Sequence, residues 1–223
     1  MASGYEQKIW NYLKNKIGNE YGVAGLMGNL YAESGLHPDI VQGDIPYSNY
    51  SKNYTAQVDS GAISKTDFVH NGPNGGGYGL AQWTFYTRKQ GLYEKWKNGK
   101  YSSIGSIDLA LDFLWVELTA SYSGVLQVLK NAASVKQASD KVLHDFERPA
   151  DQSTAVEQNR ASLGQAYYNQ FAGTGGSVPE GGGTGGDTGD TDNNFDNSSG
   201  VEWKPTNRKM SLLLMYGAVK RRK

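Results

Sequence analysis

The sequence predicts an α+β domain that is mainly helical, with a small β-hairpin excursion, followed by a disordered linker and a short tail. Apolar residues recur at three- and four-residue spacing over most of residues 1–172, as in amphipathic and buried helices. That spacing disappears between residues 40 and 77, where Tyr, Asn, Ser, Gly and Asp dominate. Residues 173–200 are mostly Gly, Thr, Ser, Asp and Asn, too polar to bury a core, and residues 201–223 form the tail.

The stretch from Gly22 to Pro38 predicts a buried helix that carries one carboxyl group, Glu33, to its C-terminal end. Gly35 and Pro38 supply the stop signals. A carboxyl group beside an apolar stripe and at the negative end of a helix is favoured in its neutral form, which suits a general acid. The alternative is an exposed glutamate at a frayed helix end. The apolar face comprises Val23, Leu26, Met27, Leu30 and Tyr31.

Two glycines inside this helix, Gly25 and Gly28, each lower helix propensity by about 1 kcal/mol relative to alanine. We therefore expect another element to pack closely against them. Further helices are predicted at residues 5–17, 86–97, 106–119, 124–131, 134–148 and 154–172, and the short hairpin is placed at residues 53–58. Thr154 and Glu157 have the spacing of a capping box.

Composition excludes several classes of function. The absence of cysteine rules out thiol nucleophiles and zinc-thiolate sites, and the three histidines show no metal-ligand spacing, so we expect no metal or cofactor. Residues 1–172 carry a net charge of about −1, which argues against nucleic-acid binding. The N-terminus has no apolar segment typical of a secretion signal.

The tail differs in character from the linker. Residues 173–200 contain five acidic and no basic residues, whereas residues 201–223 contain seven basic residues and Glu202. An apolar run from Met210 to Val219 lies between basic clusters and is shorter than the about 20 residues that span a bilayer. Two interpretations stay open: contact with an anionic wall or membrane surface or a partner, and an incidental tail, which is slightly favoured.

Three sequence blocks, in order, carry a family resemblance. They are Gly25-Leu-Met-Gly-Asn-Leu-Tyr-Ala-Glu-Ser-Gly35, Gly77-Tyr-Gly-Leu-Ala-Gln-Trp-Thr84 and Phe146-Glu-Arg-Pro-Ala150. Together they resemble the phage tail lysozyme family, which has a lysozyme-like fold, over about residues 5–172. The first two blocks are also similar to motifs of goose-type lysozymes and lytic transglycosylases.

The resemblance implies that the partner is peptidoglycan and that the reaction cleaves the β-1,4 linkage between N-acetylmuramic acid and N-acetylglucosamine. Glu33 would be the acid that protonates the glycosidic oxygen. Tyr78, Gln82 and Trp83 of the second block would face Glu33 and bind sugar, together with Tyr31 of the first block. Tyr78 and Trp83 are equally consistent with core positions.

The second carboxylate of a hydrolase is harder to assign. An inverting enzyme needs a base about 6.5–9.5 Å from the acid, whereas a lytic transglycosylase needs none. Goose-type enzymes favour Asp67 for this role; the other candidates are Asp39, Asp44 and Asp59. Glu147 fits an ion pair with Arg148 or a helix cap better than catalysis, and His37, His70 and His144 fit loop or structural positions.

Two delivery routes agree with the missing secretion signal. An endolysin waits in the host cytoplasm for a holin, and a tail-tip enzyme arrives with the virion. The short chain favours the endolysin. The alternative from a different class is a wall-binding or virion structural module on a lysozyme-like scaffold that has lost activity.

Overall fold

The computed structural model describes residues 4–72 and 76–173, which lie in one compact unit, Met1–Thr174. The predicted linker from Thr174 onward and the whole predicted tail at residues 201–223 lie outside these residues.

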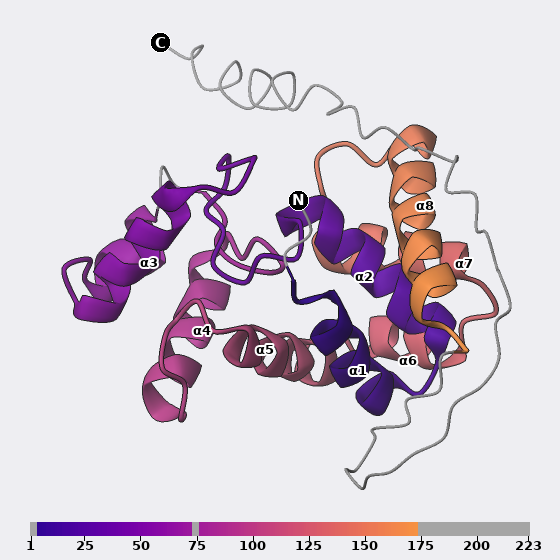
Figure 1. The fold of residues 1–223 in the computed structure, drawn as a ribbon, viewed down its shortest axis with the longest axis horizontal. Helices are drawn as coiled ribbons and strands as arrows, with labels where there is room; N and C mark the ends of the chain where they lie inside the picture. Colours follow the sequence, from indigo (N-terminus) through magenta and orange to yellow (C-terminus); the bar gives the residue numbers. More distant parts are fainter. Residues whose placement is uncertain (1–3, 73–75, 174–223) are drawn as a thin grey trace, which may run out of the picture. The chain divides into compact units, whose positions relative to one another are not determined.

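The described chain is mainly helical, as the sequence predicted, and contains no β-strand. In chain order, seven of the described helices are α1 (Glu6–Ile17), α2 (Glu20–Ser34), α4 (Tyr86–Asn98), α5 (Ile107–Ala120), α6 (Ser123–Asn131), α7 (Val135–Val142) and α8 (Thr154–Phe171) (Figure 1). One further helix, α3 (Asn49–Ser60), and two π-helical turns, η1 (Asp67–Asn71) and η3 (Leu143–Glu147), complete the order.

The predicted hairpin at residues 53–58 is wrong, because this segment is part of α3. The Ser48 hydroxyl accepts a hydrogen bond from the Tyr50 amide and caps the helix. Ser51, Thr55 and Val58 are buried at helical spacing. Burial of one helical face therefore outweighs the β propensity of this segment. In the described chain, β-type pairing is limited to isolated bridges that join Tyr78 to Val41 and to Trp83.

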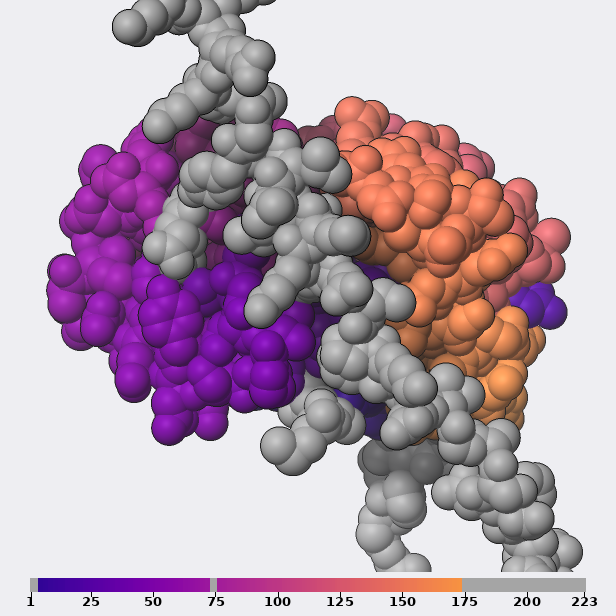
Figure 2. Space-filling view, turned by 90° about the horizontal axis from the view of Figure 1, so that it is seen from above, coloured from indigo at the N-terminus to yellow at the C-terminus, as the bar shows by residue number. Residues whose placement is uncertain are grey.

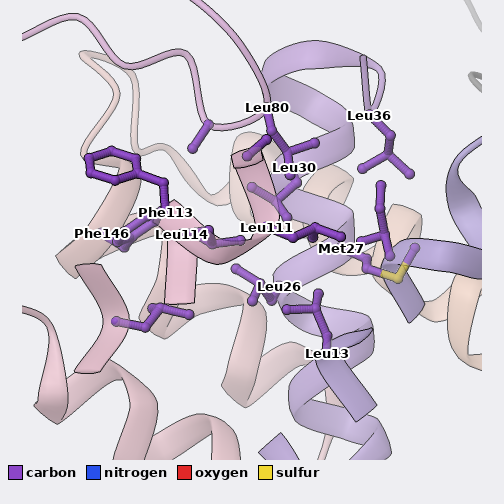
Figure 3. Packing of buried hydrophobic residues seen from close by; sticks show 14 of the residues in the cluster. Leu13, Leu26, Met27, Leu30, Leu36, Leu80, Leu111, Phe113, Leu114 and Phe146 are labelled. Atoms are coloured by element: carbon purple, nitrogen blue, oxygen red, sulfur yellow. The ribbon is translucent and has the colours of Figure 1, made fainter. Parts of the chain in front are cut away.

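Helix α2 is the central element of the domain. It packs against α1, α6, α7 and α8, which surround it in Figure 1. Leu26, Met27 and Leu30 are fully buried, and Figure 3 shows them among side chains from α1, α5 and the segment after α2. Because apolar contacts surround α2 on several sides, its position fixes those of its neighbours.

The glycines of α2 lie where neighbouring backbones approach closely. A Cβ atom at Gly22 would lie 2.0 Å from the Leu129 carbonyl oxygen of α6. At Gly28 it would lie 2.5 Å from the Arg160 carbonyl oxygen and from the Gly164 nitrogen of α8. A Cβ at Gly25 would be as close to α7. The expectation that another element packs tightly here is confirmed, and three helices do so.

The start of α8 differs from the expected capping box. Ser153 is the N-cap residue, and no side chain accepts a capping hydrogen bond there. Glu157 instead lies 2.8 Å from His144 Nε2, which also brings η3 against α8. A tertiary contact therefore takes the place of the local cap. In the view of Figure 2, α8 (orange) and the segment around α3 (purple) lie on opposite sides of the visible face.

No single helix among the described residues is long and apolar enough to cross a membrane. Helices α5 and α6 meet that criterion only when taken together, and they are bent by 100° relative to each other.

Replacing Gly28 with alanine is expected to destabilise the domain. The new methyl group would overlap backbone atoms of α8. Such overpacking lowers the unfolding free energy by about 1–3 kcal/mol, which outweighs the stabilisation from the higher helix propensity of alanine. Urea unfolding followed by circular dichroism measures the change.

Gly124→Ala is the matched control for this substitution. Gly124 lies in α6, and nothing approaches its Cβ position within 4 Å. We expect this variant to be as stable as the wild type or slightly more stable. Equal stability of Gly28→Ala would show that the contact between α2 and α8 is looser than described.

Candidate active site

Glu33 occupies the last turn of α2, as the sequence predicted. Gly35 ends the helix in the left-handed conformation, and its amide donates to the Tyr31 carbonyl at 2.8 Å. The buried Ser34 hydroxyl donates to the Leu30 carbonyl and accepts from the Leu36 amide. The Glu33 side chain is 18% exposed, so solvent reaches it from a rigid helix end.

Arg160 of α8 holds the Glu33 carboxylate from the buried side. Its Nη2 donates to Glu33 Oε1 at 2.5 Å, and its Nη1 donates to Asn29 Oδ1 at 3.2 Å. Asn29 is fully buried and donates to Gly25 and Ser139. Glu33 is thus an ion-pair partner in a fixed position, which differs from the purely apolar surroundings expected from the sequence.

A second buried ion pair joins α4 to α5. Arg88 Nε and Nη2 donate to the two carboxylate oxygens of Glu117 at 2.6 and 2.8 Å. The Trp83 indole donates to Glu117 Oε2 at 2.6 Å. Burial acts to lower the pKa of Arg88, but hydrogen bonds from Arg88 to Glu117 and the charge of Glu117 outweigh it and raise the pKa.

Glu147, at the end of η3, is the third carboxyl group in this region. Its Oε1 is buried and has no hydrogen-bond partner within the described chain. Burial, and then the charge of Glu33, raise the pKa of Glu147 well above its usual value, against the opposing charges of Arg88 and Arg160. The interpretation of Glu147 as an ion-pair partner of Arg148 is therefore wrong. Arg148 is exposed and has a backbone φ of 48°.

These contacts join the second sequence block to the third. Glu33 comes from the first block, Trp83 from the second, and Phe146 and Glu147 from the third. The guanidinium of Arg88 lies 4.9 Å from the centre of the Phe146 ring, next to Glu147 in sequence. Trp83 of the second block and Phe146 of the third block therefore both contact the Arg88–Glu117 ion pair, whereas Glu33 of the first block pairs with Arg160.

Tyr78 and Trp83 are both fully buried. The Tyr78 hydroxyl hydrogen-bonds to Thr55 Oγ1 at 2.8 Å, and the Trp83 ring packs against Phe113 with 5.1 Å between ring centres. Neither ring offers a free face for stacking on a sugar in this structure. Tyr78 and Trp83 therefore occupy core positions, which was the alternative to sugar binding. The exposed rings near this block belong to Phe85 and Tyr86, which the sequence analysis did not select.

The second block forms a tight turn against the segment that follows α2. Tyr78 and Trp83 exchange backbone hydrogen bonds, and the Gly79 amide donates to the Ile40 carbonyl. The Gln82 side chain donates to the carbonyls of Ile40 and Gly79. Gly79 has a φ of 79°, and a Cβ there would lie 2.9 Å from the Pro38 carbonyl oxygen. The glycine thus permits close backbone contact inside the protein.

Tyr31 lies two residues before Glu33 and is partly buried. Its ring meets that of Tyr167 edge to face, with 6.1 Å between ring centres. This contact turns Tyr31 toward α8, the helix that also carries Arg160.

Asp67, the predicted second carboxylate, is exposed on η1. It accepts hydrogen bonds from the Ser64 hydroxyl at 2.6 Å and from Asn71 at 2.9 Å, and these lower its pKa. Within the described residues, no hydrogen bond or ion pair links Asp67 to Glu33.

The other candidate carboxylates also have structural partners. Asp39 accepts from Tyr47, Asp44 accepts from Ser48 and Ser51, and Asp59 accepts from the Ile104 amide. Over residues 4–72 and 76–173, no group of three or more His, Cys, Asp and Glu side chains is arranged to hold a metal ion.

A comparison with protein families agrees with this arrangement. The family model described as phage tail lysozyme matches residues 5–171. This chain belongs to the phage tail lysozyme family. The matched range includes α1 to α8 and all three blocks. Membership of a lysozyme family implies a lysozyme-type enzyme that lyses peptidoglycan. Neither the curated proteins nor the solved structures that were compared contain a match.

Sequence reasoning missed Arg160 and gave Glu147 a different role. One signal for Arg160 was present, because it is the only basic residue in α8 and lies one helical turn before Gly164, which packs against α2. The sequence shows Glu147 only beside Arg148, whereas burial and then the charge of the distant Glu33 raise the pKa of Glu147. In this member of the phage tail lysozyme family, the first block carries the partly exposed Glu33, and Arg160, which lies outside the three blocks, supports it from α8.

Glu117→Gln is expected to lower the unfolding free energy by about 3 kcal/mol, because it leaves the buried Arg88 guanidinium without a countercharge. Thermal unfolding followed by tryptophan fluorescence measures this change. The double variant Glu117→Gln, Arg88→Met removes both charges and should recover part of the loss. A double variant less stable than the single one would contradict a charge-based explanation.

Proposed function

We propose that this chain cleaves the β-1,4 linkage between N-acetylmuramic acid and N-acetylglucosamine in peptidoglycan, with Glu33 as the general acid. The observation that carries the proposal is the position of Glu33, a partly exposed carboxyl group on the end of a buried helix, held by an ion pair with Arg160. A general acid must reach the leaving oxygen while its own position stays fixed.

The surroundings of Glu33 support this role. Arg160, which also donates a hydrogen bond to Asn29, holds the inner side of the carboxyl group, and the exposed part of the side chain is left for the substrate. In the reaction, Glu33 gives a proton to the glycosidic oxygen while the bond from this oxygen to the anomeric carbon of muramic acid breaks. The rigid C-terminal turn of α2 keeps the carboxyl group in one orientation.

Two enzyme types share this first step. A hydrolase needs a second carboxylate, for which Asp67 remains the proposed residue. A lytic transglycosylase uses the substrate's own hydroxyl group and needs no second carboxylate. Asp39, Asp44, Asp59 and Asp67 all accept hydrogen bonds from the protein, which makes each less available to activate water. This observation is why the transglycosylase is kept as the second candidate.

Because Tyr78 and Trp83 are buried, we propose that more accessible side chains contact the substrate. Tyr31 and Gln82 remain proposed contacts, and the exposed rings of Phe85 and Tyr86 follow the second block directly. Aromatic faces of this kind stack on sugar rings.

The cleavage reaction proposed for Glu33 suits two delivery routes. One is an endolysin held in the host cytoplasm until holin action, and the other is a lysin carried on a virion tail.

Glu33→Gln is expected to reduce the release of soluble glycan from purified Gram-positive walls by at least about 100-fold, because the amide keeps the shape and cannot donate the acid's proton. Mass spectrometry of the released muropeptides measures both the amount and the new ends. Reducing muramic ends identify a hydrolase, and 1,6-anhydro ends identify a transglycosylase.

Glu20→Gln is the matched control. Glu20 lies in the first turn of the same helix and pairs with Lys14, far along α2 from Glu33. We expect the control to retain wild-type activity. Equal activity of Glu33→Gln and wild type would overturn the role of Glu33, and a wild type inactive on all walls would favour the inactive structural module.

A further inference from the structure

We propose that Asn29 is a positioning residue for the candidate acid: it fixes the guanidinium group of Arg160, which in turn holds one oxygen of the Glu33 carboxyl group and leaves the other for the substrate. The catalytic part of this inference rests on the proposed function of Glu33. The fixed guanidinium group does not, and it can be tested without a substrate.

Arg160 joins two residues on one face of α2. Asn29 and Glu33 are four positions apart, so their side chains lie on the same face of the helix. From α8, Arg160 donates from Nη1 to Asn29 Oδ1 at 3.2 Å and from Nη2 to Glu33 Oε1 at 2.5 Å. A guanidinium group is planar and rigid, so fixing one terminal nitrogen restricts where the other points. Asn29 therefore acts on Glu33 through Arg160.

The orientation of the Asn29 amide is set by its other contacts. Its Nδ2 donates to the carbonyl oxygens of Gly25 and Ser139, at 2.9 and 3.1 Å, and to the Ser139 hydroxyl at 3.0 Å. Because a carbonyl oxygen only accepts hydrogen bonds, the Nδ2 side of the amide must face these groups. Asn29 Oδ1 is thereby directed to Arg160. A leucine at this position would offer Arg160 no acceptor.

Burial makes this contact selective. Asn29 and Ser139 are fully buried, and Arg160 is 7% exposed. A guanidinium N–H that loses its partner in such a place finds little water to replace it and is costly to leave unpaired. We therefore expect Arg160 to keep both bonds in the wild type and to reorient when residue 29 no longer accepts.

The bond from Arg160 gives the two oxygens of Glu33 different tasks. Oε1 accepts the guanidinium N–H, so the proton of the neutral carboxyl group resides on Oε2. In the proposed reaction the Oε2–H bond breaks as a new O–H bond forms on the glycosidic oxygen, which keeps the electron pair of the broken C–O bond. The positive charge of Arg160 then stabilises the carboxylate that is left.

The alternative is that Asn29 and Arg160 only stabilise the packing of α2 against α7 and α8. A buried ion pair is weak evidence for stability, because apolar residues of similar volume are often as stable in its place. A purely structural role predicts a lower unfolding free energy with unchanged kinetics of the folded protein. The kinetics of the folded variants therefore separate the two roles.

Asn29→Leu keeps a similar volume and removes the acceptor for Arg160. On a soluble oligosaccharide of alternating N-acetylglucosamine and N-acetylmuramic acid, we expect kcat to fall by about tenfold and KM to stay within about twofold of wild type. The reason is that Glu33 is displaced while the sugar contacts remain. An unchanged kcat in the folded variant would overturn the inference.

Tyr12→Phe is the matched control for Asn29→Leu. It removes a partly buried hydrogen bond between α1 and α5, from the Tyr12 hydroxyl to Asp112 at 2.7 Å, and this bond does not involve α2. We expect kcat and KM of the control to equal those of wild type. An equal loss of kcat in Tyr12→Phe would overturn the inference, since loosening of the helix packing anywhere would then explain the effect.

A kinetic double-mutant cycle tests whether Asn29 acts through Arg160. We expect Arg160→Met to lower kcat at least as much as Asn29→Leu, and the double variant to lose no more than Arg160→Met alone. Losses that multiply in the double variant would overturn the inference, since Asn29 would then affect catalysis by a route that does not need Arg160.

Side-chain NMR of arginine in the full chain tests the fixed guanidinium group without substrate, and it decides the question even where Asn29→Leu fails to fold. In the wild type we expect separate signals for the two Nη groups of Arg160, because the bonds to Asn29 and Glu33 hinder rotation. The spectrum of Arg160→Lys assigns these signals. A single averaged Nη signal for Arg160 in the wild type would overturn the inference.

The outcomes separate this inference from the proposed function. An active wild type with a wild-type kcat in Asn29→Leu overturns the positioning role and leaves Glu33 as the acid. A wild type inactive on all walls overturns the proposed function and with it the catalytic part of the inference, while the NMR signals still decide whether Arg160 is fixed.

Discussion

The close contact of α2 with three neighbouring helices is the constraint on which the rest of the structure depends. Without side chains at Gly22, Gly25 and Gly28, the backbones of α6, α7 and α8 approach α2 closely. This approach places Arg160 of α8 between Asn29 and Glu33. A glycine pattern that lowers helix propensity therefore serves to position a charged group beside the candidate acid.

The buried charges depend on this framework in turn. Ion pairs taken out of water stabilise a protein only when their geometry is good and their remaining hydrogen bonds are satisfied. The bidentate contact of Arg88 with Glu117, completed by the Trp83 indole, meets that condition. Glu147 does not, since its Oε1 lacks a partner. Such an unsatisfied group inside an otherwise satisfied network is where function, rather than stability, is the better explanation.

The sequence was sufficient for features with a local signal. Helical periodicity and the stop at Gly35 predicted α2 and the place of Glu33 on it, because a buried helix has a strong pattern. The three blocks identified the family, which the family comparison supports. Two glycines predicted a tight helix contact, although nothing in the pattern said which helices would provide it.

The remaining features depend on contacts between distant segments. The segment at residues 53–58 is β-prone by composition, yet burial of Ser51, Thr55 and Val58 makes it helical. Glu147 was interpreted as an ion-pair partner of Arg148 or a helix cap, because nothing near it in the sequence indicates that its Oε1 is buried. Aromatic residues in a sequence block look the same whether they line a surface or, like Trp83, fill the core.

The most direct test of the account is a crystal structure of Glu33→Gln with a bound peptidoglycan oligosaccharide. The account predicts a glycosidic oxygen within about 3 Å of the residue 33 side chain, with Arg160 still behind that side chain. A glycan that binds with no glycosidic oxygen near residue 33 would contradict it.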